Sequence, residues 1–517
     1  MHDSIGKRTA HNSFYSLLAN GCYLLSRFLL TPFTLHFLSL EEYGLWSLCF
    51  VVMSFLALTS MGFEGTYVKY VAEFQGGGHY SQVNRLLSTG LVISSLLAVF
   101  FMFALYFLMP FLLTILHIEK AWHEKASLLF LGTGLVFTID ISLNCFGRAL
   151  DGIQQIGLTS KVRLGTIFVE LILIVFFLLL GYGIYGLLAA FIIRYLLAII
   201  INTYYAFKLI PRLSIRLGYL DFPSLKLLCS YGGKMQILGF IGIFMSTFDR
   251  LIITRLLGLG MAGMYEVGRK LPATGASIPA VISGVMVPAL SHLQGMKELS
   301  KARKLFLEGS RYMAMISAFL FSYLFITAPW LISFWLGAGY EAAVGVMQIM
   351  TVGVFVNLLT GTSSALSKGF AKLDLELKYA SMNMLLCLLM TPLLTLQFGL
   401  IGTALGVAGS TVIASIWFIG MTNIFFKVSL LHYFKMIGHP LLVILCSAAG
   451  LFLLLSQFVV IEQSNRMLTG LILLAVALVH LLLSALLLFM SHGLIQNEVQ
   501  WFQKKILSRW GLLRNIS

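Results

Sequence analysis

The sequence predicts an all-α integral membrane protein with about fourteen transmembrane helices. The chain has 517 residues, of which 59% are hydrophobic and only 11% are charged, and its mean hydropathy is +0.93. A soluble protein of this length needs a more strongly charged surface, so an apolar solvent is required. Runs such as 164–180 and 471–490 approach the length of about 20 residues that spans a bilayer. These runs recur along the whole chain, which excludes a single membrane anchor.

Hydropathy and the breaks between apolar runs divide the chain into spans with bounds uncertain by about 2–4 residues. The predicted spans are 13–38, 44–66, 85–109, 125–146, 163–182, 184–207, 231–257, 262–289, 308–329, 341–362, 376–396, 400–425, 436–459 and 467–489. An even number of spans places both termini on the same side of the membrane.

The distribution of basic residues indicates on which side of the membrane the two termini lie. Of the 35 lysines and arginines, 26 lie in alternate loops and at the two ends, whereas the opposite loops carry only Lys120, Lys125 and Arg466. Loops rich in lysine and arginine stay in the cytoplasm, so both termini are predicted to be cytoplasmic. The same rule explains the net charge of +15 without a nucleic-acid partner.

Short glycine-containing segments recur at nearly one offset, which indicates an internal repeat. The matched pairs are 37–44 with 256–263, 183–186 with 399–402, and 151–154 with 368–371. A unit repeated at this offset predicts two six-helix lobes of parallel orientation. Transporters built from parallel repeats have such lobes around a central cavity. The predicted parts are an N-terminal lobe at 1–208, a cytoplasmic linker at 209–230, a C-terminal lobe at 231–427, helices 13 and 14 at 428–490, and an amphipathic cytoplasmic tail at 491–517.

Ten charged residues are assigned to the membrane interior, in addition to those counted with the loops and to Glu64 near an inner span end. The basic ones are Arg27, Arg194, Arg250, Arg255, Arg269 and Lys270, and the acidic ones are Asp140, Glu170, Asp249 and Glu266. Each charge costs about 2.5–3.5 kcal/mol at a lipid-facing midplane, so most of them should face a wet cavity or a partner. Basic groups exceed acidic groups by two even if every acid is paired.

This cationic excess suits a phosphate-bearing ligand, because arginine offers a planar fork of donors to phosphate oxygens. Arg27, Arg250 and Arg269 lie at similar predicted depths and are the candidates for a shared anion site, with Lys270 and Arg194 in the same cationic cavity. The acids Asp249, Glu266, Glu170 and Asp140 have two interpretations: coupling groups, or members of structural ion pairs.

The eighth predicted span contains Pro272, Gly275 and Pro279, which should interrupt its helix. Interrupted helices are typical of transporter sites, although a fixed packing kink explains the same residues. The sequence contains no phosphate-binding loop of the Gly-x-x-x-x-Gly-Lys-Ser/Thr type and no cluster with metal-ligand spacing. We therefore expect no catalytic residues, no metal and no cofactor.

Two segments resemble the polysaccharide flippases of the multidrug/oligosaccharidyl-lipid/polysaccharide exporter superfamily. The first is Arg27–Pro32 followed by Leu40–Trp46, and the second is Asp249–Ile253 followed by Leu257-Gly258 and Gly263–Tyr265. The resemblance implies two six-helix bundles forming a V, two additional helices and a location in the cytoplasmic (inner) membrane. It also implies export of undecaprenyl-diphosphate-linked oligosaccharide units, with cavity arginines as a theme of the family.

The leading functional hypothesis is a flippase that moves a lipid-linked anionic oligosaccharide to the outer leaflet for cell-surface polysaccharide or O-antigen synthesis. The expected partners are this lipid, the membrane lipids and a polysaccharide polymerase. Coupling to the membrane potential, H⁺ or Na⁺ stays open. The alternatives are a cation-coupled multidrug exporter, which would favour an acidic cavity, and a flippase for a lipid-linked peptidoglycan precursor, which sequence separates only weakly.

Overall fold

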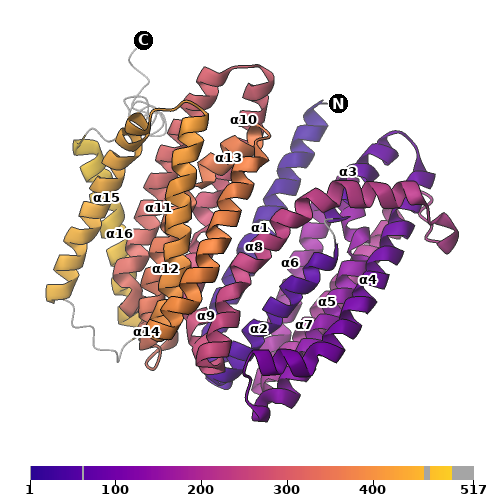
Figure 1. Ribbon diagram of the computed structural model, residues 1–517, viewed down its shortest axis with the longest axis horizontal. Helices are drawn as coiled ribbons and strands as arrows, with labels where there is room; N and C mark the ends of the chain where they lie inside the picture. The colour runs from indigo at the N-terminus through magenta and orange to yellow at the C-terminus, as the bar shows by residue number, and fades with distance from the viewer. Residues whose placement is uncertain (1, 61–62, 459–465, 492–517) are drawn as a thin grey trace, which may run out of the picture. The chain divides into compact units, whose positions relative to one another are not determined.

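The computed structural model describes residues 2–60, 63–458 and 466–491, and every regular element in these ranges is helical (Figure 1). The predicted all-α class is therefore confirmed. Ten helical segments of the described chain are long and apolar enough to cross a membrane. Large apolar side chains such as Phe107 and Leu482 are exposed along them, as expected for surfaces that face lipid. The number of fourteen spans stays a prediction.

Contacts divide the chain into two compact units, and each is described by itself. Unit 1 comprises Met1–Val267 together with Thr391–Thr403, and unit 2 comprises Gly268–Met390 together with Ala404–Ser517. The two six-helix lobes inferred from the repeat, with their linker, stay a prediction. Predicted tail residues 492–517 lie outside the described part of the chain.

Unit 1 is built from long helices that pack side by side. Its elements are α1 (His2–Phe37), α2 (Leu40–Leu56), η1 (Ala57–Ser60), α3 (Phe63–Gly76), α4 (Tyr80–Ile115), η2 (Lys120–Trp122), α5 (His123–Gly152), α6 (Ile156–Leu179), α7 (Gly183–Leu209), η3 (Leu217–Tyr219), α8 (Phe222–Leu257) and the first residues of α9 (Leu259–Gly275). Helix α5 packs against α4 and α7, and α6 packs against α1 and α7. A core that includes Leu45, Leu48, Phe130 and Phe191 fills the space between them.

Helix α2 and the start of α9 cross where both carry glycine. A Cβ atom on Gly44 would collide with the carbonyl oxygen of Leu259, and one on Gly263 would collide with that of Leu40. Small residues permit such close approach of two backbones in a membrane. Gly44 and Gly263 are also equivalent positions in the repeat inferred from sequence, so the two copies of the glycine meet each other.

The segment between α7 and α8 is held against α4 by buried polar side chains. The Asn84 side-chain amide donates to the Arg212 carbonyl oxygen at 2.9 Å, and the Ser214 backbone amide donates to Asn84 Oδ1 at 3.1 Å. The Asp221 backbone amide donates to Thr89 Oγ1 at 3.2 Å, and the Asp221 side chain caps α8 by accepting from the Ser224 amide at 3.0 Å. This part of the predicted linker is thus bound to α4 through its backbone.

Unit 2 contains the remaining helices. They are the end of α9, α10 (Ser277–Gly295), α11 (Leu299–Leu336), α12 (Glu341–Leu359), α13 (Gly361–Gly369), α14 (Leu373–Phe425) apart from Thr391–Thr403, which belong to unit 1, α15 (Leu430–Phe458) and α16 (Arg466–Met490). Helix α11 packs against α12, α15 and α16. A fully buried histidine joins three of them: His480 Nε2 lies 3.0 Å from Ser322 Oγ, and His480 Nδ1 lies 3.3 Å from Ser447 Oγ.

The 53-residue α14 is two helices joined at Gly399, whose backbone is non-helical (φ 58°, ψ −134°). The hydroxyls of Thr395 and Thr403 lie 2.9 Å apart, although an uninterrupted helix separates residues eight apart by about 12 Å. The chain therefore reverses at Gly399, between predicted spans 376–396 and 400–425. Glycine is suited to this position because its φ is positive.

Two predicted spans are interrupted. The span predicted at 262–289 is divided into α9, which ends at Gly275, and α10, which begins at Ser277. The span predicted at 44–66 was expected to be continuous, but α2 ends at Leu56 and the η1 turn follows before α3. Pro272 and Pro279 account for the first interruption, whereas no proline marks the second. The two breaks, after Leu56 and after Gly275, are 219 residues apart, which is within the 216–219 residues that separate the matched segments of the repeat.

Candidate functional site

Two arginines of unit 1 share one buried glutamate. Arg27 Nη2 donates to both carboxylate oxygens of Glu170, at 2.8 and 2.9 Å, and Arg194 Nη1 lies 3.3 Å from Glu170 Oε2. The side chains of Arg27 and Arg194 are 19% and 13% exposed, and that of Glu170 is 4% exposed. We call these three residues the arginine cluster. It comes from three helices, because Arg27 lies in α1, Glu170 in α6 and Arg194 in α7.

The three residues of the arginine cluster lie at similar distances from one end of their helices. Arg27 precedes the end of α1 at Phe37, Glu170 precedes the end of α6 at Leu179, and Arg194 follows the start of α7 at Gly183. Each separation is about ten residues, or about 15 Å of helix. This is about half the thickness of the hydrocarbon core of a bilayer.

An aromatic ring supports both guanidinium groups. The guanidinium carbons of Arg27 and Arg194 lie 5.1 and 5.6 Å from the centroid of the Tyr23 ring, and that of Arg194 also lies 5.0 Å from the Tyr195 ring. Such contacts favour a desolvated cation. Tyr23 precedes Arg27 by one helical turn, which places the two side chains on the same face of α1.

Two cations and one anion leave the arginine cluster with a net charge of +1. The Arg27 Nε atom is buried and has no hydrogen-bond partner in the described structure. An unsatisfied buried donor costs about 1–3 kcal/mol, so a ligand that accepts from it is favoured. The cluster can therefore hold an anion by charge and by hydrogen bonding.

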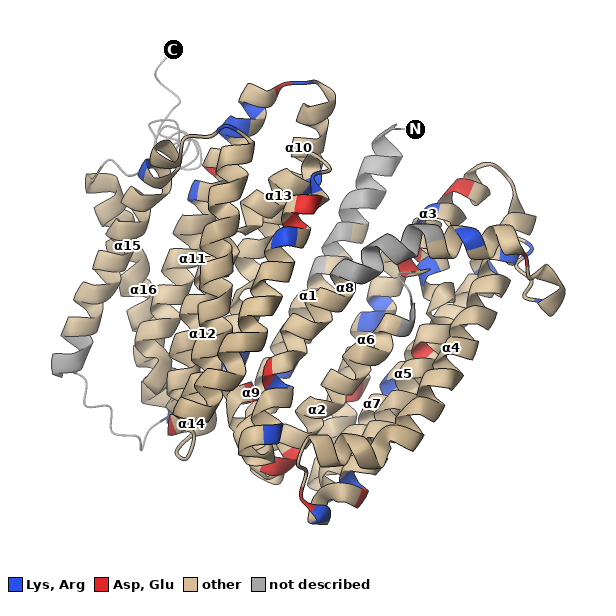
Figure 2. Ribbon diagram, viewed as in Figure 1, with Lys and Arg blue, Asp and Glu red and all other residues tan. Residues whose placement is uncertain are grey.

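A polar cavity of about 420 Å³ reaches the arginine cluster from the α5–α6 turn. Helices α1, α5, α6 and α7 line it, and its charged side chains are Asp140, Arg148, Asp151, Arg163 and Arg194. We call it the polar chamber. Figure 2 shows the charged residues of unit 1 gathered mainly toward the ends of its helices, so charges deep within the unit are few.

Arg148 and Arg163 are held by residues around the chamber. Arg148 lies 2.5 Å from Glu64 Oε2 and 3.4 Å from Asp151 Oδ2, and the Thr159 hydroxyl donates to Asp151 at 2.6 Å. Arg163 Nη2 donates to Asn20 Oδ1 at 2.7 Å. These contacts fix the wall of the chamber at the end that carries the α5–α6 turn, which is predicted to face the cytoplasm.

A second group of charges joins α8 and the start of α9. Arg250 Nε lies 3.9 Å from Glu266 Oε2, and Arg250 Nη2 donates to the Ser246 carbonyl oxygen at 2.9 Å. The buried Asp249 accepts from the Arg250 backbone amide at 2.8 Å and from the Tyr265 hydroxyl at 3.0 Å. Asp249 is thus tied to α9 by the Tyr265 hydroxyl, and its coupling and structural interpretations both stay predictions.

Arg269 and Lys270 follow the boundary between the units, so they belong to unit 2. The shared anion site of Arg27, Arg250 and Arg269 accordingly stays a prediction. What the structure does bring together is Arg27, Arg194 and Glu170. All three are predicted from the sequence to lie inside the membrane, but the sequence predicts no pairing among them and no role for Tyr23 or Tyr195.

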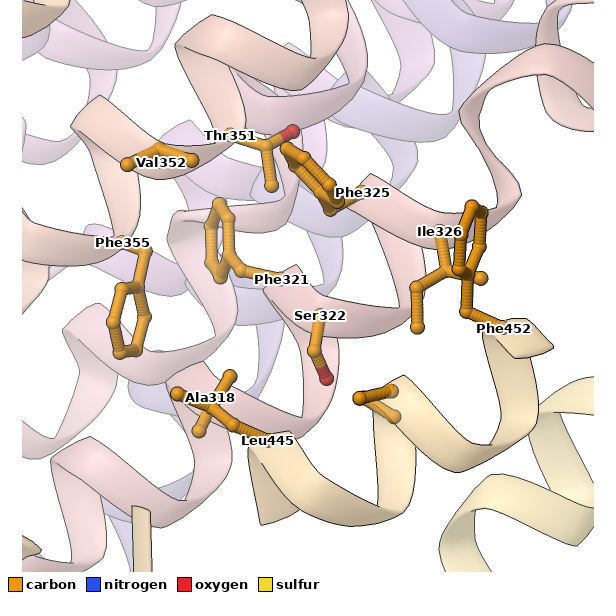
Figure 3. Close-up of a pocket in the computed structure, with 12 residues that line it drawn as sticks. Ala318, Phe321, Ser322, Phe325, Ile326, Thr351, Val352, Phe355, Leu445 and Phe452 are labelled. Carbon is orange, nitrogen blue, oxygen red and sulfur yellow. The ribbon is translucent and has the colours of Figure 1, made fainter. Parts of the chain in front are cut away.

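Unit 2 has a cavity of a different kind (Figure 3). It has a volume of about 370 Å³ and lies between α11, α12 and α15. Its wall is formed by apolar side chains such as Phe321, Phe355 and Phe452, with Ser322 and Thr351 as the two hydroxyl-bearing residues. Among the described residues that line it, none is charged.

Helices of spanning length around a charged chamber define a membrane protein of the transporter and flippase type. The chain belongs to the polysaccharide biosynthesis protein family, whose model matches residues 36–345. Its helical fold is also that of the lipid II flippase MurJ in an inward closed conformation, at a TM-score of 0.71 and 16% identity, covering 92% of this chain and 98% of the other. An inward-facing multidrug resistance transporter of the MATE family gives a TM-score of 0.62 at 14% identity, covering 80% and 94%.

Two curated sequences are also similar. A Shigella flexneri protein named for O-antigen transport is 21% identical over 380 residues, which is 71% of this chain and 86% of the other. The uncharacterized membrane protein EpsK of Bacillus subtilis is 20% identical over 273 residues, or 52% of this chain and 54% of that protein. These matches confirm the resemblance inferred from Arg27–Pro32 and Asp249–Ile253.

Proposed function

We propose that this protein moves an undecaprenyl-diphosphate-linked oligosaccharide from the cytoplasmic to the outer leaflet of the inner membrane. The observation that carries the proposal is the arginine cluster: two guanidinium groups share one carboxylate at mid-depth and keep a net positive charge. The diphosphate binds there, because guanidinium groups form short charge-assisted hydrogen bonds with phosphate oxygens. Family membership and the similarity to a protein named for O-antigen transport support the saccharide part of the cargo.

The cargo enters the polar chamber from the cytoplasmic side, where the α5–α6 turn and both termini lie. Its isoprenoid tail stays in the bilayer, and transport proceeds by alternating access without an enzymatic step. Outward movement of an anion is downhill in an inside-negative potential by about 2.3 kcal/mol per charge per 100 mV. The membrane potential therefore contributes to the driving force.

The multidrug alternative is disfavoured by charge. A chamber that attracts cationic drugs needs an excess of acidic groups, whereas this one contains three arginines and two aspartates. The peptidoglycan-precursor alternative shares the diphosphate chemistry, and the likeness to MurJ supports the fold alone.

The test uses the full-length protein in proteoliposomes that contain an undecaprenyl-diphosphate-linked saccharide with a fluorescent label on the sugar. We expect the label to reach the far leaflet faster than in protein-free vesicles, and collapse of an imposed inside-negative potential should slow it. Rates equal to those of protein-free vesicles, or transport of a cationic dye in place of the saccharide lipid, would contradict the proposal. Transport of lipid II but not of other saccharide lipids would favour the peptidoglycan alternative.

A matched pair of variants connects the assay to the site. Arg194→Gln removes one donor of the arginine cluster and lowers its net charge to zero. Hydrogen bonds to charged groups contribute about 1.5–3 kcal/mol, so transport should fall about 10- to 100-fold. Lys304→Gln removes a charge from an exposed pair, since the Lys304 side chain is 77% exposed, and it should leave transport unchanged.

A further inference from the structure

The polar chamber holds side chains that the arginine cluster does not use. Asp140 and Asn144 lie one turn apart on α5, and Asn202 faces the same space from α7. With a volume of about 420 Å³, the chamber is within the range of about 300–1,000 Å³ of small-molecule sites. Since the diphosphate is assigned to the arginines, a further ligand group remains to be assigned to this space.

Two polar groups of the chamber accept no hydrogen bond within the described part of the chain. The Asp140 carboxylate has only the more distant charges of Glu64, Arg148 and Arg194 around it, and the buried Asn202 Oδ1 atom has no hydrogen-bond donor. Buried polar groups are normally satisfied, so groups left open around a cavity indicate a ligand that satisfies them. Both open groups are acceptors, which calls for a ligand that donates.

A glycine keeps the space between these side chains open. A Cβ atom on Gly147 would lie 3.2 Å from Asn144 Oδ1 and 3.5 Å from Asn202 Nδ2. Gly147 has helical neighbours on both sides in α5, where alanine would be the better helix former. Its presence is explained by the room that it leaves beside the two amides.

The charged side chains of the chamber limit the class of ligand that it can bind. A metal cation would meet the guanidinium groups of Arg148, Arg163 and Arg194, and a phosphate would meet the carboxylates of Asp140 and Asp151. A sugar hydroxyl suits both kinds of group, because it donates to carboxylate and amide oxygens and accepts from guanidinium and amide N–H groups. The mixture of acid, base and amide therefore favours a neutral polyol.

We propose that the polar chamber binds the sugar nearest the diphosphate and that Asp140, Asn144 and Asn202 select its hydroxyl pattern. This inference rests on the proposed transport of a saccharide diphosphate lipid. Arg194 belongs both to the arginine cluster and to the chamber wall, so a diphosphate at the cluster places the attached sugar in the chamber. A site that hydrogen-bonds a hydroxyl rejects an analogue that lacks it, because its buried polar groups are then left unpaired.

The experiment measures binding of free sugars to the full-length protein in lipid nanodiscs by saturation-transfer-difference NMR. The probes are glucose, galactose, N-acetylglucosamine and the deoxy sugar rhamnose. We expect millimolar binding of at least one probe and a clear preference within the set. Asp140→Asn should weaken the preferred probe about 10-fold or more, and Gly147→Ala should weaken it without changing any charge.

The matched control is Asp374→Asn, because Asp374 is an exposed acid at the start of α14. It should leave sugar binding unchanged. Sugar binding that is absent for every probe, or that survives both Asp140→Asn and Gly147→Ala, overturns the proposal. Binding of Na⁺ or inorganic pyrophosphate that is lost in both chamber variants overturns it as well, because the chamber would then be an ion site.

The failure of this inference can be distinguished from failure of the proposed function. Inorganic pyrophosphate binding that depends on Arg27 and Arg194 tests the diphosphate site separately and needs no sugar. Flipping of the saccharide lipid with no sugar preference would retain the transport function and remove the chamber's role in selection. Sugar binding without any flipping of the saccharide lipid would retain the chamber's role in sugar selection and remove the transport function.

Discussion

Glu170→Gln is the perturbation whose consequences can be worked out furthest from the structure. The wild-type carboxylate contacts Arg27 at 2.8 and 2.9 Å and Arg194 at 3.3 Å. Glutamine keeps the shape but removes the negative charge, so the net charge of the arginine cluster rises from +1 to +2. Removing one partner of a buried ion pair costs about 3–5 kcal/mol because a buried charge is left uncompensated.

This loss should be visible in thermal unfolding. An unfolding entropy of about 2.1 cal/mol/K per residue over 517 residues makes about 1 kcal/mol equivalent to about 1 °C, so Tm should fall by about 3–5 °C. A thiol-reactive dye can follow unfolding, because Cys49, Cys145 and Cys387 are buried. The exposed Cys229 and Cys446 and the partly exposed Cys22 are first changed to serine to remove background.

A double variant separates charge from shape. Glu170→Gln combined with Arg194→Gln returns the net charge to +1, and contacting residues are expected to be non-additive by about 0.5–3 kcal/mol. The double variant should therefore be more stable than Glu170→Gln alone. A Glu170→Gln protein whose Tm lies within about 0.5 °C of the wild type would refute the reasoning, as would additive losses in the double variant.

Three further substitutions test other parts of the structure. Gly44→Ala should destabilise the protein by about 1–3 kcal/mol through overpacking. The control Gly165→Ala should be neutral or stabilising, because a Cβ atom at Gly165 meets nothing within 4 Å. Equal unfolding curves for the two variants would contradict the close crossing of α2 and α9 at Gly44. Asn84→Ala should accelerate amide hydrogen exchange in residues 212–221, because the two hydrogen bonds of the Asn84 side chain are lost. Unchanged exchange would show that Asn84 does not hold the segment between α7 and α8. His480→Leu should lower the free energy of unfolding by less than about 2 kcal/mol, which is the usual contribution of interhelical hydrogen bonds in membranes, and it should preserve transport. A stable variant without transport would disprove a purely structural role of His480.

Much of the fold could be predicted from local sequence signals. Proline at 272 and glycine at 399 act on their own backbone, so the interruption of one span and the reversal between two others follow from residue type alone. The break after Leu56 lacks such a signal, and its match to the repeat offset becomes apparent only beside the interruption after Gly275.

The sequence indicates which charged residues belong to the site but not which of them contact one another. Polarity inside an apolar run marks Arg27, Glu170 and Arg194 as residues that need a partner. Their pairing depends on packing between α1, α6 and α7, and Arg27 and Glu170 are 143 residues apart in the sequence. Tyr23 could have been found from its spacing of one turn before Arg27. Asn202, in contrast, comes close to Gly147 of α5 only through the packing of α7 against α5.

The role of the arginine cluster is tested by comparing wild-type protein with the Arg27→Gln/Arg194→Gln double variant in proteoliposomes at equal folded fractions. The substrate is an undecaprenyl-diphosphate-linked saccharide under an imposed inside-negative potential. We expect the wild type to move this lipid to the outer leaflet and the double variant, whose cluster carries only the charge of Glu170, to lose at least 100-fold in rate. Equal rates for the two proteins would contradict a role of these arginines in carrying the diphosphate.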